Sequence, residues 1–137
     1  MYATCTALRI FENESGPTCR IEYAIAGQPA MLHASSATAS VYQLSDQQLP
    51  LGLLAAPPYQ GHTVDLLPGD LLLVATDGVL EAEKKDGVEF GFEQLEPLLL
   101  ENRAQPLATI AERIHRALSA SYAQKDDQSL LLIRVIS

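Results

Sequence analysis

The sequence is organised around a short, continuous apolar run, Leu71 to Ala75, the longest such run in the chain. The turn-forming residues Pro68-Gly69-Asp70 precede it, and Thr76-Asp77-Gly78 follow it. This run of five residues is too short for a typical helix and far too short to cross a membrane. We therefore predict that it is a fully buried central strand of a sheet.

Alternating apolar and polar residues predict further strands on both sides of this run. The first two alternating segments flank residues 12–18, which contain Asn, Ser, Gly and Pro, and this arrangement predicts an antiparallel hairpin. Strands are expected at residues 2–11, 19–25, 30–33, 41–44, 62–66 and 129–136.

Two helices are expected between the central strand and the last strand. Apolar residues recur at helical spacing from Leu107 to Tyr122, and Pro106 suits the first turn of that helix. The other helix spans roughly residues 92–101, where Pro97 either kinks it or places its start later. Strands in one block and helices in another indicate an α+β fold, with an antiparallel sheet covered by helices.

Composition narrows the class of protein. A chain of 137 residues suffices for one domain, and its net charge of -8 argues against non-specific nucleic-acid binding. We expect no membrane association, because the chain has no apolar run long enough to span a bilayer and its N-terminus does not resemble a signal peptide. A cytoplasmic location is expected, with Cys5 and Cys19 as buried free thiols.

Aspartates stand at the ends of two predicted strands. Asp77 directly follows the central strand, with Gly78 allowing a sharp turn and room for a ligand, and Asp126-Asp127 precede the last strand. If the two strands are antiparallel neighbours, Asp77 and Asp126 converge at one sheet edge, where clustered carboxylates suit Mg²⁺ or Mn²⁺. Alternatively, these aspartates are ordinary turn and loop residues. The three histidines lack metal-ligand spacing: His33, His62 and His115.

Three segments resemble the bacterial sporulation stage II protein E-like branch of the type 2C protein phosphatases: residues 21–33, 49–98 and 125–135. The resemblance covers nearly the whole chain and depends on the order and spacing of its motifs. The most specific motifs are Pro50-Leu51-Gly52, Pro68-Gly69-Asp70, Thr76-Asp77-Gly78-Val79 with Glu81-Ala82, Phe90-Gly91 and Asp126-Asp127.

The resemblance implies a four-layer architecture, with two antiparallel sheets packed face to face and helices outside. It implies a binuclear Mn²⁺ or Mg²⁺ centre in which Asp77 and Asp126 are catalytic metal ligands, Asp127 is a further ligand, and Thr76 and Gly78 support them. A metal-activated water would then hydrolyse phosphoserine or phosphothreonine on a small bacterial regulatory protein, of the kind that antagonises anti-sigma factors.

The sequence departs from the family pattern at two places. Gln28 stands where the family usually has histidine, and the family's N-terminal portion, with an early metal-binding aspartate, has no counterpart. We therefore expect residues 1–137 to form a single, incomplete phosphatase domain that is weakly active or inactive alone and forms homodimers through an uncovered sheet. The alternatives are a non-catalytic, phosphatase-like regulatory or binding module and a plain structural domain.

Overall fold

The computed structural model describes residues 1–55 and 58–136. The described residues leave out residues 56–57, which belong to the segment 49–98 that carries part of the resemblance. They also leave out residue 137, the end of the expected domain. The elements follow in the order β1 (Cys5–Glu12), β2 (Cys19–Ala26), β3 (Met31–Ala34), β4 (Val41–Leu44), β5 (His62–Leu66), β6 (Leu71–Ala75), α1 (Asp77–Leu80), α2 (Gly91–Asn102), α3 (Leu107–Ser121) and β7 (Leu130–Arg134).

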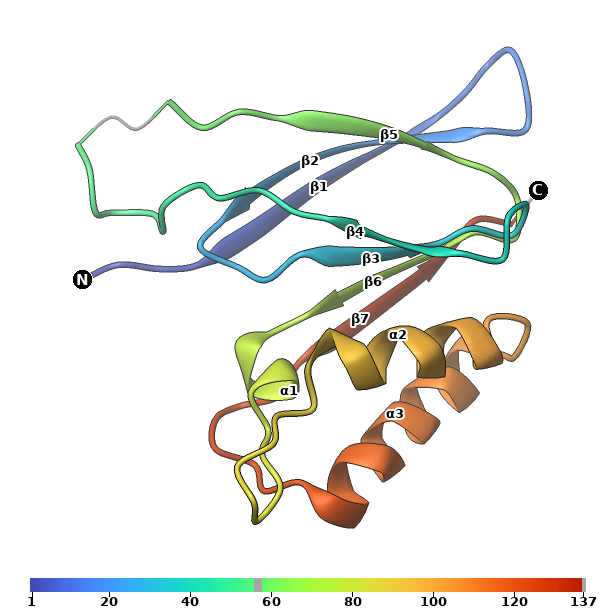
Figure 1. Ribbon diagram of the computed structural model, residues 1–137. Helices are drawn as coiled ribbons and strands as arrows, with labels where there is room; N and C mark the ends of the chain where they lie inside the picture. The colour runs from blue at the N-terminus through green and yellow to red at the C-terminus, as the bar shows by residue number, and fades with distance from the viewer. Residues whose placement is uncertain (56–57, 137) are drawn as a thin grey trace.

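The strands form two antiparallel sheets. One has the order β1-β2-β5 and the other the order β4-β3-β6-β7. The two sheets lie face to face, and the helices lie on the far side of the four-stranded sheet (Figure 1). Each strand expected from the sequence is present, with bounds that differ by a few residues.

The central strand β6 is buried as predicted. It lies between β3 and β7, and its side chains alternate between two apolar cores. Leu72 packs between the two sheets, whereas Leu71, Leu73 and Ala75 pack against the helices. A strand with apolar partners on both faces needs a continuous apolar sequence, which explains the run that the sequence displays.

The predicted hairpin is also present, with Cys5 opposite Ala26 and Glu12 opposite Cys19. Ile21 and Ile25 of β2 are fully buried, because their side chains lie in the core between the two sheets. The expectation of buried thiols is wrong in degree: both cysteines are free but only half-buried. They stand at opposite ends of the β1–β2 hairpin, and each lines a groove on the surface.

The helices differ from expectation at three points. Helix α2 begins at Gly91 and contains Pro97 in its interior, so the alternative of a start after the proline is wrong. Helix α3 follows Pro106, which is its N-cap. The one-turn helix α1 was not expected, because four residues are too few to show helical periodicity.

The α+β sandwich flanked by helices is confirmed, but within residues 1–55 and 58–136 the helices cover the four-stranded sheet alone (Figure 1). The described residues therefore form three of the four expected layers. Among them, no helix is long and apolar enough to cross a membrane.

Candidate active site

The candidate site lies where β6 ends and β7 begins. The two strands are antiparallel neighbours, with Ala75 opposite Leu130 (Figure 1). The predicted convergence of the two aspartate-bearing segments required the two strands to be antiparallel neighbours, and they are. Their pairing places Thr76-Asp77-Gly78 beside Asp126-Asp127, although the two segments are about fifty residues apart in the sequence.

Thr76 joins the start of α1 to the start of β7. Its amide donates to the carbonyl of Ser129 at 3.1 Å, and its hydroxyl accepts from the amide of Ser129 at 3.0 Å. Its carbonyl oxygen accepts from the amide of Val79 at 3.0 Å, which begins α1. Thr76 therefore continues the β6–β7 ladder by one residue and fixes where the chain turns into the helix.

Gly78 allows the two aspartate-bearing segments to touch. A Cβ atom at this position would overlap the carbonyl oxygen of Asp127 and lie 3.1 Å from that of Asp126. The room for a ligand expected at Gly78 is therefore wrong on this side of the residue, because the main chain of Asp127 fills the space. The sharp turn is present, since only Thr76 separates the end of β6 from the start of α1. Gln128 Nε2 completes the contact by donating to the Gly78 carbonyl at 3.1 Å.

The three aspartates differ in exposure. Asp77 is the first residue of α1 and is half-buried, whereas Asp126 and Asp127 are exposed. Asp126 Oδ1 accepts a hydrogen bond of 2.7 Å from the amide of Asp127. None of the ion pairs found in residues 1–55 and 58–136 uses these carboxylates. Their roles as ligands remain a prediction from the sequence.

The aspartates do not by themselves fit a binuclear metal centre. Across the described part of the chain, no group of three or more His, Cys, Asp and Glu side chains could hold a metal ion. Mn²⁺ and Mg²⁺ require several oxygen ligands, and two ions require more carboxylates than these segments supply. No chemical step through a metal can therefore be assigned to these residues alone.

Two histidines are held elsewhere by carboxylates. His33 Nε2 lies 2.8 Å from Asp70 Oδ2 in a buried pair, and His62 Nε2 lies 2.6 Å from Asp46 Oδ2. Nothing local in the sequence signals either pair, because the partners are 37 and 16 positions apart.

An uncharged groove of about 380 Å³ opens beside Thr76, between β1 and the β6–β7 pair. Gln28, the residue that departs from the family pattern, lines it and donates to Thr4 Oγ1 at 2.7 Å. The hydroxyl of Thr6 is buried there without a hydrogen-bond partner among the described residues. Hydroxyl and amide groups thus adjoin the candidate site on the side toward β1.

The comparisons with known proteins agree with this architecture. A family model described as stage II sporulation protein E matches residues 1–136. The SiaA-PP2C domain of Pseudomonas aeruginosa shares the fold with a TM-score of 0.70 and 25% identity, over 84% of this chain and 46% of that one. No curated protein sequence matches the chain.

Two further solved structures share the fold at lower identity. The RsbU and RsbW domains of a Mycobacterium tuberculosis protein give a TM-score of 0.71 and 22% identity, over 85% of this chain and 32% of that one. The phosphatase domain of the cell fate determinant SpoIIE from Bacillus subtilis gives a TM-score of 0.70 and 17% identity, over 99% of this chain and 60% of that one. One structure of that Bacillus domain was presoaked with Mn. The chain thus spans between 32% and 60% of these three solved chains.

Proposed function

Because the chain belongs to the stage II sporulation protein E family and has the fold of type 2C phosphatase domains, we propose that it is part of a protein serine/threonine phosphatase. The proposed reaction is hydrolysis of phosphoserine or phosphothreonine on a small bacterial regulatory protein of the anti-sigma factor antagonist type. The observation that carries the proposal is the contact of Thr76-Asp77-Gly78 with Asp126-Asp127 at one end of the sandwich.

In this proposal Asp77 and Asp126 are the catalytic metal ligands, and Asp127 contributes beside them. Thr76 and Gly78 hold the two segments in contact, through the hydrogen bonds of Thr76 and the close approach at Gly78. Carboxylate oxygens suit Mn²⁺ or Mg²⁺, and a bound cation would supply charge neutralisation for a phosphate. Association of two copies and a cytoplasmic location are part of the same proposal.

The chain alone is expected to be weakly active or inactive. The described residues provide no group of three metal-binding side chains, so the proposed centre needs ligands beyond these. The same observation favours a second candidate function, a non-catalytic, phosphatase-like module that binds a phosphoprotein. In either case we propose that residues 1–137 act as one domain unit, since both sheets share a core.

The proposal is tested by two measurements on the 137-residue chain. Mn²⁺ binding is followed by electron paramagnetic resonance, and hydrolysis of p-nitrophenyl phosphate is followed with Mn²⁺ or Mg²⁺. We expect weak Mn²⁺ binding that Asp77→Asn or Asp126→Asn reduces at least about tenfold, equivalent to about 1.4 kcal/mol, with little or no hydrolysis.

Asp86→Asn is the matched control, because Asp86 also precedes a glycine but lies in the turn before Gly87, where its Oδ1 accepts from the amide of Val88. This control should bind Mn²⁺ as the unmodified chain does. Equal loss of binding in all three variants, or no loss in any, would contradict the assignment of the site. Strong Mn²⁺-dependent hydrolysis that disappears in Asp77→Asn would keep the site but overturn the expected low activity.

A further inference from the structure

All the lysines of the chain gather at one hollow of its surface. Lys84, Lys85 and Lys125 line a groove of about 370 Å³ between the loop that follows α1 and the end of α3. The chain has 9 basic residues against 17 acidic ones, so its surface as a whole is negatively charged. This lysine groove is therefore an exception on an acidic surface.

The main chain holds the two walls of the lysine groove together. The amide of Ala123 donates to the carbonyl of Glu83 at 2.7 Å, which joins the segment after α3 to the loop after α1. The amide of Lys84 donates to the carbonyl of Val88 at 2.9 Å and closes that loop. The groove lies on the helix side of the molecule and is built from these two segments alone (Figure 1).

The three lysines are engaged to different degrees. The ammonium of Lys84 lies 5.2 Å from the centre of the Tyr122 ring. That of Lys125 lies 2.5 Å from a carboxylate oxygen of Glu83. Lys85 is exposed, and in the part of the chain that the structure describes no ion pair holds its side chain. Among the described lining residues, three lysines against one glutamate leave a net charge of +2.

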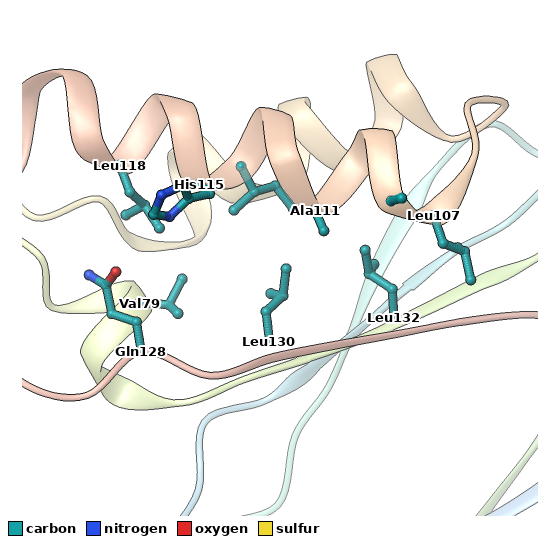
Figure 2. Close-up of a pocket in the computed structure, with 10 residues that line it drawn as sticks. Val79, Leu107, Ala111, His115, Leu118, Gln128, Leu130 and Leu132 are labelled. Carbon is teal, nitrogen blue, oxygen red and sulfur yellow. The ribbon is translucent and has the colours of Figure 1, made fainter.

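The second hollow under α3 has a different chemistry. The cavity between α3 and β7, also about 370 Å³, is lined mainly by apolar side chains such as Val79, Leu118 and Leu130 (Figure 2). Among its described lining residues, His115 alone can carry a charge. An anionic partner would gain little there, whereas the lysine groove offers ammonium groups that form charge-assisted hydrogen bonds.

The lysine groove adjoins the candidate active site. Lys125 lines the groove and its neighbour Asp126 belongs to the site, so one main-chain step of about 3.8 Å joins the two. On the other wall, Glu83 closely follows α1, whose first residue is Asp77. An extended peptide bound at the candidate site can therefore reach the groove within a few residues.

We propose that the lysine groove binds an acidic segment next to the phosphorylated residue of the phosphoprotein. The proposal rests on the proposed function, which makes the partner a phosphoprotein and places its phosphate at Asp77 and Asp126. The groove then takes the carboxylates that flank this phosphate. A net charge of -8 repels an acidic partner over most of the surface, so the groove selects where such a partner can approach.

The test uses the 137-residue chain and two fluorescein-labelled peptides that each contain one phosphoserine, flanked by glutamates in one and by glutamines in the other. Fluorescence anisotropy at low ionic strength, without metal, should show tighter binding of the glutamate peptide. Lys85→Glu should weaken its binding at least about fivefold. Arg9→Glu is the matched control: it makes the same change in net charge at an exposed position of β1, in the other sheet, and should leave binding nearly unchanged.

A second variant should bind the glutamate peptide more tightly. Glu83→Gln removes the carboxylate charge that engages Lys125, so we expect binding to tighten about twofold or more. Such a gain cannot come from a loss of structure. Asp65→Asn is its matched control, because it makes the same change in net charge and opens an exposed ion pair with Arg20 in the other sheet. This control should not tighten binding.

The outcomes separate the lysine groove from the catalytic site. Equal binding of the two peptides, or equal effects of Lys85→Glu and Arg9→Glu, would overturn the groove as a docking site, whatever Mn²⁺ binding shows. If Asp77→Asn left Mn²⁺ binding unchanged while Lys85→Glu weakened peptide binding, the groove would stand and the proposed catalytic site would fall. Failure of Glu83→Gln to exceed Asp65→Asn would also count against the groove.

Discussion

Directly before β6, the carboxylate of Asp70 joins the turn at residues 67–70 to residues 33–36, at the end of β3. It is buried and accepts hydrogen bonds from His33 Nε2, from the amide and hydroxyl of Ser36, and from the amide of Leu67, over distances of 2.7 to 3.0 Å. Burial alone would raise the pKa of Asp70, but the hydrogen bonds from Ser36, Leu67 and His33 outweigh it and lower the pKa.

We predict that Asp70→Asn lowers the free energy of unfolding by about 1–3 kcal/mol at neutral pH. An amide has one acceptor oxygen in place of two, so at least one buried donor loses its partner. Urea denaturation followed by circular dichroism measures the change. The control is Asp65→Asn, which removes the exposed Arg20–Asp65 ion pair and should have little effect.

The same carboxylate should make stability depend on pH. Since the folded-state pKa of Asp70 is below its unfolded value, its contribution is present above about pH 4 and is lost as the pH falls through the lowered pKa. The unmodified chain should therefore lose more stability than Asp70→Asn on acidification. Parallel pH profiles for the two proteins would rule out this role.

Among the elements, α2 carries an internal conflict at Pro97. The proline is exposed and stands in the seventh position of the helix, where it cannot donate to the carbonyl of Glu93. Phe92, Leu95 and Leu99 nevertheless keep the helix on the sheet by packing into its core. The helix is thus held by tertiary packing against the preference of one residue.

We predict that Pro97→Ala raises the free energy of unfolding by about 1–2 kcal/mol, because it restores a hydrogen bond and removes a steric clash. The expected gain in the free energy of unfolding is smaller than the full cost of a proline inside a helix, because proline also restricts the unfolded chain. The urea midpoint measures it. Gln94→Ala, at another exposed position of α2, should change stability by less than about 0.5 kcal/mol. A destabilised Pro97→Ala would contradict the prediction.

How far the sequence predicts an element depends on where its stabilising contacts lie. The strands β2 and β6 show their burial directly in the order of apolar residues, so they could be predicted. The helix α1 could not, because one turn has no period and is fixed by Thr76 and the segment beside Gly78. The start of α2 could not be predicted either, because Pro97 alone favours a later start and the observed start depends on how the helix packs against the sheet.

The candidate site was predictable in one respect and not in another. Asp77 and Asp126 flank two apolar strands, so their segments had to meet once those strands paired in antiparallel order. The filled space at Gly78 was not predictable, because it depends on how closely the main chain of Asp127 approaches. Sequence order thus locates the two segments, whereas their fit follows from the packing of α1.

At the scale of the whole molecule, one sheet serves two cores. Leu72 of β6 contributes to the core between the sheets, and its neighbours Leu71 and Leu73 contribute to the core under the helices. Loss of either core would leave one face of the four-stranded sheet exposed to water. The two cores are therefore expected to depend on each other, and the chain is expected to unfold in one cooperative transition.

We predict that Ile21→Ala, in the core between the sheets, and Leu99→Ala, in the core under the helices, each lower the free energy of unfolding by about 2–5 kcal/mol. In each variant, the helix signal in circular dichroism and the NMR signals of Ile25 should change at the same urea concentration. Val88→Ala, at a side chain that is 52% exposed, should leave the midpoint nearly unchanged. A shared sheet should transmit the loss of stability from one core to the other. If Leu99→Ala lowered the midpoint of the helix signal alone, while the signals of Ile25 kept their original midpoint, the two cores would be independent and the prediction would be wrong.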